Sequence, residues 1–127
     1  MSLSLVLLRG ELSVHRLPAD APLPACLTGE PFYALLRSRD ELSVCCRSEL
    51  EMVSERREDG WACLMVAGPL DFGLTGIVAG VTAPLAEAEI PVFVVSSFDT
   101  DYLLVKLDTL ERACDALRQR GFHVTTE

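Results

Sequence analysis

The stretch IPVFVVSSFDTDYLLVKL, residues 90–107, decides how this chain folds. Residues 90–97 are rich in β-branched side chains, residues 101–107 to a lesser degree, and such side chains favour strands. The three residues Phe98-Asp99-Thr100 between them have the length of a hairpin turn. The stretch therefore predicts two antiparallel strands joined by a short turn.

Upstream of this hairpin, the sequence predicts a strand and then a helix. Residues 61–67 are short, apolar and closed by Gly68-Pro69, as is typical of a covered strand. From Leu74 to Ala88 the apolar residues recur every three or four positions, which lines one face of a helix. Because a proline inside a helix removes one backbone hydrogen bond, Pro84 predicts a kink.

Downstream, a second helix is well defined by its own signals. Asp108 is the expected N-cap, and Glu111 follows it three residues later. An apolar stripe with helical spacing follows, at Leu110, Ala113, Cys114 and Leu117. Gly121 is expected to close the helix in the left-handed conformation, and residues 122–125 to form a last strand.

The resulting order is strand, helix, strand, strand, helix, strand. It predicts an α+β ferredoxin-like sandwich, with helices on one face of a four-stranded antiparallel sheet. The first half is less regular, with expected strands at residues 3–8, 11–17, 32–38 and 41–47. Four prolines in residues 18–31 permit at most a short helix there, so this half is predicted to be a reduced unit. The charged residues 49–60 are expected to form a surface connector.

Composition excludes several classes of partner. The 127 residues carry a formal charge of −8, which disfavours binding to nucleic acid. The longest apolar runs are far shorter than the roughly 20 residues of a membrane helix. Residues 1–9 lack the features of a secretory signal, so a cytoplasmic protein without membrane contact is expected. Five cysteines without a C-x-x-C pair predict buried thiols.

The residue types that serve catalysis or metal binding do not form a motif in this sequence. His15 and His123 are the two histidines, each in an apolar strand context with no nucleophile motif nearby. Cys45 and Cys46 are adjacent, so in a strand they point to opposite faces. The sequence therefore predicts no enzyme, no metal site and no cofactor.

Two segments could instead hold a small ligand. Residues Gly73 to Gly76 occupy the predicted first helical turn, whose free amides attract a carboxylate. The alternative is that these glycines only permit a tight turn. The segment Ser96 to Asp101 offers hydroxyls and two carboxylates that could hold an ammonium group, although such residues are common in any hairpin turn.

These segments also carry a family resemblance. The run GPLDFGLTGIV at residues 68–78, the residues LAEAEIPVF at 85–93 and SSFDTDYLLVK at 96–106 closely resemble small tandem ACT-domain proteins. Residues 121–124 continue the likeness, and residues 32–35 and 40–45 are similar to the same group. This group is related to the regulatory units of aspartate kinases and to the CASTOR-type amino-acid sensors.

The resemblance implies a regulatory, allosteric protein that binds an amino acid without catalysis. It implies two ACT-like units, a reduced one at residues 1–59 with the charged connector and a complete one at residues 60–127, and a homodimer. The ligand-binding residues that it implies are Asp71, Phe72, Gly73, Leu74, Thr75, Gly76, Ser96, Ser97, Phe98, Asp99, Thr100 and Asp101. The alternative is a dimerisation or protein-interaction module without a ligand.

Overall fold

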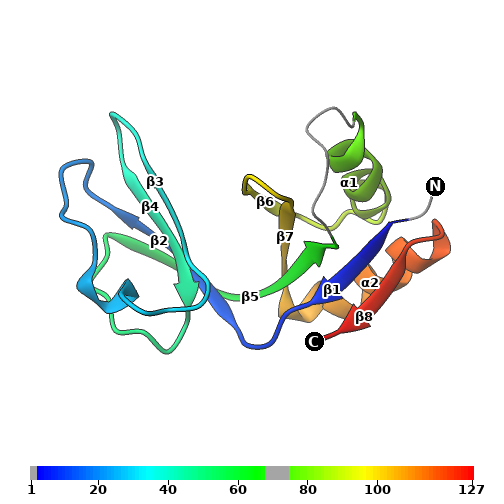
Figure 1. Cartoon of the computed structure of the whole chain (residues 1–127), viewed down its shortest axis with the longest axis horizontal. Coiled ribbons are helices and arrows are strands. Elements are labelled where there is room, and N and C mark those ends of the chain that lie inside the picture. The colour runs from blue at the N-terminus through cyan, green and yellow to red at the C-terminus, as the bar shows by residue number, and fades with distance from the viewer. Residues whose placement is uncertain (1–2, 68–74) are drawn as a thin grey trace. The chain divides into compact units, whose positions relative to one another are not determined.

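The computed structural model describes residues 3–67 and 75–127 (Figure 1). The chain forms two compact units: residues Met1–Arg9 with Trp61–Glu127, here the C-terminal unit, and Gly10–Gly60, here the N-terminal unit. The second boundary between the units falls between Gly60 and Trp61, whereas the sequence placed the division between residues 59 and 60. However, the first nine residues belong with the C-terminal unit.

The sheet of the C-terminal unit contains one strand more than expected. Its strands follow the order β6 (Phe93–Ser96), β7 (Asp101–Lys106), the C-terminal part of β5 (Arg56–Val66), β1 (Ser4–Leu7) and β8 (His123–Thr126). The hairpin of β6 and β7 confirms the prediction from residues 90–107.

β1 stands between β5 and β8 and corrects the predicted four-stranded antiparallel arrangement. Leu5 pairs with Val66 of β5 in an antiparallel register and with Val124 of β8 in a parallel register. The Leu5 side chain is fully buried in the core of this unit. Burying it adds apolar area to that core, which explains why a strand from the chain's first residues joins this sheet.

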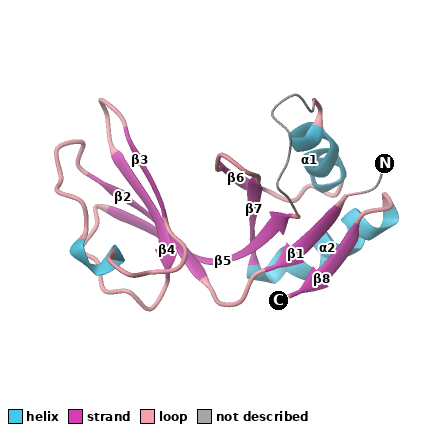
Figure 2. Ribbon diagram, in the orientation of Figure 1, coloured by secondary structure: helices cyan, strands magenta, loops and turns pink. Residues whose placement is uncertain are grey.

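Both helices cover the same face of this sheet (Figure 2). The helix α1 spans Ile77–Glu87, and the helix α2 spans Leu110–Gln119. Their buried side chains join the inward-facing residues of β5 and β7 in one cluster: Val81, Leu85, Ala113 and Leu117 with Leu64, Val66, Leu103 and Val105. The predicted ferredoxin-like layering is confirmed.

The helix ends differ in part from the prediction. α1 begins at Ile77, and the chain remains helical through the buried Pro84 to Glu87, so the kink stays a prediction. Asp108 is not the N-cap of α2, because a short 3-10 turn, η2 (Leu107–Thr109), places Thr109 in that position. Gly121 has a φ of 95°, as predicted for the residue that closes α2.

The N-terminal unit is a smaller sheet with its own core. Its strands run in the order β3 (Ala34–Arg37), β4 (Leu42–Arg47), β2 (Leu12–Leu17) and then the first residues of β5. A 3-10 turn, η1 (Ala25–Leu27), replaces a full helix, as the prolines predict. Its core comprises Leu17, Leu27, Leu42, Val44 and Cys46.

The charged segment 49–60 is only partly a connector. Residues 56–60 begin β5, and the first four of them are exposed, so the charges lie on the solvated part of a strand. The side chain of Glu11 accepts a hydrogen bond from the Gly60 amide at 3.2 Å, which fixes this end of β5 to the start of β2. Residues 48–55 are irregular.

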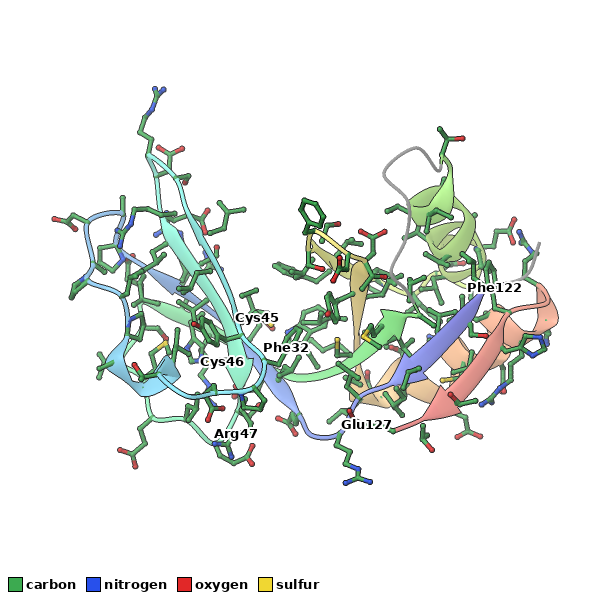
Figure 3. All side chains as sticks on the ribbon, viewed as in Figure 1. Phe32, Cys45, Cys46, Arg47, Phe122 and Glu127 are labelled. Carbon is green, nitrogen blue, oxygen red and sulfur yellow. The ribbon has the colours of Figure 1, made fainter. Side chains whose placement is uncertain are left out.

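All the cysteines except Cys26 are buried. Cys45 and Cys46 lie side by side on β4 (Figure 3), where Cys46 enters the core of the N-terminal unit. In the described residues, no three histidine, cysteine or acidic side chains gather as ligands of a metal. None of the helices in residues 3–67 and 75–127 is long and apolar enough to cross a membrane.

Candidate ligand site

The predicted site residues fall on two segments of the C-terminal unit. The first leads into α1, where Thr75 and Gly76 are exposed. The second is the turn between β6 and β7, with Asp99 at its exposed tip. Four further predicted residues, Asp71, Phe72, Gly73 and Leu74, lie outside the described residues.

The opening of α1 is a helix terminus that begins at a glycine. Gly76 is the N-cap in the left-handed conformation, with a φ of 75°, and its carbonyl accepts the Gly80 amide at 2.8 Å. Among the described residues, no side chain caps this end of the helix. The first-turn amides of α1 belong to residues 77–79, because the helix begins at Ile77 and not at Leu74 as predicted.

The described residues at this opening, 75–80, are small or apolar and carry no charge. Gly76, Ala79 and Gly80 are exposed, and a β-carbon added at either glycine would meet no atom within 4 Å. Val78 contributes an apolar side chain that is partly exposed. A small carboxylate can therefore approach the amides without a steric barrier from these residues, and the helix dipole favours its negative charge.

The turn between β6 and β7 is closed by its own polar groups. The Ser97 amide donates to the Thr100 carbonyl at 2.8 Å, and the Thr100 amide donates to the Ser97 hydroxyl at 3.2 Å. The Ser96 hydroxyl donates to the Asp101 carboxylate. The turn chemistry that the sequence left as an alternative is thus present at Ser96, Ser97 and Thr100.

A buried hydrogen bond ties this turn to the end of β5. The Thr100 hydroxyl donates to the carbonyl of Val66 at 2.6 Å, and the Thr100 side chain is buried. Val66 is the last residue of β5, from which the chain leads to α1. The turn therefore lies beside the start of the segment that carries the other predicted site residues.

Acidic and aromatic side chains lie at the turn between β6 and β7. Asp99 and Asp101 offer carboxylates at the turn, and Phe98 offers an aromatic ring that is 80% exposed. The two histidines lie elsewhere: His15 is buried in the N-terminal unit, and His123 is exposed on β8. The turn thus presents acidic side chains beside the end of β5.

The sequence reasoning missed one cluster on the sheet. The rings of Trp61 and Phe93 lie 6.1 Å apart, and the Lys106 ammonium lies 4.7 Å from the centre of the Trp61 ring. Trp61 and Lys106 are directly paired across β5 and β7. Strand alternation alone could not reveal this cluster, because the register between the two strands was unknown.

Comparisons with known proteins agree with this architecture. A sequence profile described as ACT domain matches residues 56–119. The cytosolic arginine sensor for mTORC1 subunit 1 of Pongo abelii is 28% identical, over 84% of this chain and 35% of that protein. The chain thus spans about a third of the length of the curated relatives it matches.

Solved structures extend the likeness. A crystal structure of a protein from Agobacterium tumefaciens is 36% identical with a TM-score of 0.90, over 100% of this chain and 95% of that chain. The regulatory subunit of aspartate kinase from Thermus thermophilus, in its ligand-free form, is 13% identical with a TM-score of 0.62, over 95% of this chain and 98% of that one. At that identity, the likeness to the aspartate kinase subunit concerns the fold.

Proposed function

Because this chain belongs to the ACT-domain family, we propose that it is a regulatory protein that binds a free amino acid without catalysing a reaction. The relative from Pongo abelii is named as a cytosolic arginine sensor. That description supports a sensing role and a cytoplasmic location for this chain. The amino acid itself is left to experiment.

The proposed binding mode uses both segments, the opening of α1 and the turn between β6 and β7. The ligand carboxylate accepts hydrogen bonds from amides at the opening of α1, together with those of residues 73–76. The ligand ammonium meets Asp99 or Asp101 on the turn. The observation that carries this proposal is the buried bond from Thr100 to Val66, because it holds the acidic turn beside the strand that leads to α1.

The energetic requirement is modest. Binding in the millimolar to micromolar range needs about 4 to 8 kcal/mol. Two or three hydrogen bonds to charged groups contribute roughly 1.5 to 3 kcal/mol each. Part of that gain offsets the lost freedom of the ligand. A site made from one helix opening and one turn is therefore sufficient.

A thermal-shift screen tests the proposal. Arginine, lysine, threonine and small apolar amino acids are added in turn at millimolar concentration, and the binder raises the melting temperature because it stabilises the native state. The binder is then tested as its amide, which lacks the carboxylate charge, and as its N-acetyl derivative, which lacks the ammonium charge. Both derivatives are expected to raise the melting temperature less than the binder does. Asp99→Asn and Asp101→Asn should weaken binding, whereas Asp108→Asn on η2 is the matched control. The absence of a shift with every amino acid would overturn the proposal.

A second function, homodimerisation without a ligand, is favoured by the edge strand β6. In the described sheet, β6 pairs with β7 on one side only. Its residues Phe93–Ser96 carry no charge, and Phe93 and Val94 are 37% and 39% exposed. Exposed edge strands usually carry charged residues that prevent pairing with another chain. An uncharged apolar edge is therefore suited to antiparallel pairing with a second copy.

Sedimentation velocity across a dilution series tests this second function. Dimerisation predicts a sedimentation coefficient that falls on dilution, and a charge of −8 on each copy predicts a stronger dimer at higher salt. Val94→Lys should give a monomer, because it places charges on the edge, whereas Leu36→Lys, on the exposed face of β3, should not. A strict monomer at all concentrations would rule this function out.

A further inference from the structure

We propose that residues 48–55, here the strap, are held closed on β2 by His15, and that protonation of His15 releases them. The strap joins β4 to β5 within the N-terminal unit and has no regular secondary structure. This proposal goes beyond amino-acid binding, because it concerns a different unit of the chain.

The strap is fastened to β2 at both ends. At its start, the Ser48 amide donates to the Glu11 carbonyl at 3.0 Å, and the Ser48 hydroxyl lies 2.7 Å from that of Ser13. At its end, the Glu55 amide donates to the Arg16 carbonyl at 2.9 Å, and their side chains form an ion pair at 3.2 Å. These contacts define a closed segment with fixed ends.

His15 holds the strap just before its second end. Its Nδ1 lies 3.0 Å from the hydroxyl of Ser54, and the imidazole is 1% exposed. Between the ends, Leu50 and Met52 pack on the core cluster that includes Val44, the residue paired with His15 across β4. The Val53 side chain instead faces solvent and is 98% exposed. The strap therefore lies over the part of the core that surrounds the imidazole.

The second imidazole nitrogen makes a charged His15 unfavourable in the closed state. Nε2 is buried, and no hydrogen-bond partner for it exists among the described residues. A neutral imidazole leaves one weakly polar nitrogen unpaired, whereas the protonated ring must donate from both nitrogens. A buried cation with an unpaired N–H is costly, and exposure to water relieves that cost.

The charged groups around His15 act in opposite directions. Burial and the nearby Arg57 guanidinium lower the pKa of His15 below its ordinary value of 6.5. Asp59, which lies on β5 with Arg57, raises that pKa. On β4 the facing groups are neutral: Val44, and beyond it Cys46, whose thiol pKa is raised by burial to about 11. From the strap, the facing group is the neutral Ser54 hydroxyl. The net effect favours the neutral ring when the strap is closed.

The sign of the pH effect follows from this difference. An open strap exposes His15, which then titrates near 6.5, whereas the closed state binds the proton less well. The closed state therefore has its full stability above pH 6.5, and its stability relative to the open state decreases as the pH falls below that value. If the closed state binds no proton at pH 5.5, opening becomes about tenfold more frequent than at pH 7.5.

Hydrogen exchange on the full chain tests the proposal. Protection factors of the Ser48, Leu50 and Glu55 amides, which donate to main-chain carbonyls in the closed strap, are measured at pH 7.5 and 5.5 and corrected for intrinsic exchange. The proposal expects them to fall three- to tenfold at pH 5.5, and His15→Gln to abolish this change because the side chain cannot be protonated. The control His123→Asn, on β8 of the other unit, should retain the full change.

Two results would overturn the proposal. One is a change below threefold in the unaltered chain, and the other is a folded His15→Gln variant with the same change as the unaltered chain. If His15→Gln does not fold, the imidazole proton signals of the unaltered chain are titrated by NMR instead. Strap amide shifts that follow the titration of His15 would support the proposal, and strap shifts independent of it would overturn it.

Discussion

The hydroxyl of Thr100 donates a hydrogen bond of 2.6 Å to the main-chain carbonyl of Val66, and the two residues are 34 positions apart. The bond is buried. It joins the turn between β6 and β7 to the end of β5, and in the chain this turn and β5 are separated by α1 and β6. Since a turn is usually the most mobile part of a hairpin, this bond fixes the acidic residues beside it.

Thr100→Val removes the donor while keeping the shape of the side chain. The Val66 carbonyl would lose this buried partner, so we expect a loss of about 1 to 3 kcal/mol of unfolding free energy. Under the proposed function, amino-acid binding weakens as well. Urea denaturation and the thermal-shift assay measure the two effects. Thr125→Val on the exposed strand β8 is the matched control and should change neither.

Leu64→Ala creates a cavity in the core under both helices. Leu64 is fully buried in the cluster that joins β5 to α1 and α2, so we expect a loss of about 2 to 5 kcal/mol. Leu36→Ala on β3 removes the same group from a side chain that is 65% exposed, and it should have little effect. Equal losses in the two variants, measured by urea denaturation, would contradict this account of the core.

Glu89→Gly should stabilise the protein. Glu89 follows the C-terminus of α1 with a φ of 58°, a conformation that glycine adopts without strain. Its amide and that of Ile90 close the helix by hydrogen bonds to Ala86 and Leu85. We expect a gain of about 1 kcal/mol, because left-handed backbone is unfavourable for other residues.

The matched control for this variant is Ala86→Gly, at an exposed position inside α1. There, glycine should destabilise the protein by about 0.5 to 1 kcal/mol. The two substitutions introduce the same residue three positions apart, so opposite signs in urea denaturation isolate the backbone effect. A loss of stability in Glu89→Gly would show that the side chain has another role.

The buried thiols should resist alkylation. Burial raises the pKa of Cys45 to about 12 and that of Cys46 to about 11, and the thiolate is the reactive form. With iodoacetamide at pH 8, we expect the partly exposed Cys26 to be labelled first, and Cys45 and Cys46 only in urea. Peptide mass spectrometry after timed quenching measures the order. Rapid labelling of Cys45 in the native protein would contradict its burial.

The two candidate segments were recognisable from residue types, but not the detail of their contacts. Glycines before an apolar repeat indicated a helix opening, and hydroxyl and acidic residues indicated a turn. The helix opens at Ile77 because Gly76 adopts the left-handed N-cap conformation, and a backbone conformation of this kind is not fixed by residue spacing. The bond from Thr100 to Val66 depends on strand register, which the pattern of residues did not provide.

The sequence by itself determined the hairpin of residues 90–107, both helices, the closing glycine of α2 and the apolar faces that form the core. These features depend on local periodicity and on the intrinsic preferences of neighbouring residues. Only the tertiary structure decided that Leu5 lies between Val66 and Val124, and that residues 56–60 are a strand. Strand pairing is made by backbone groups that every residue carries, so the choice of partner is set by total burial across distant segments and not by any local pattern.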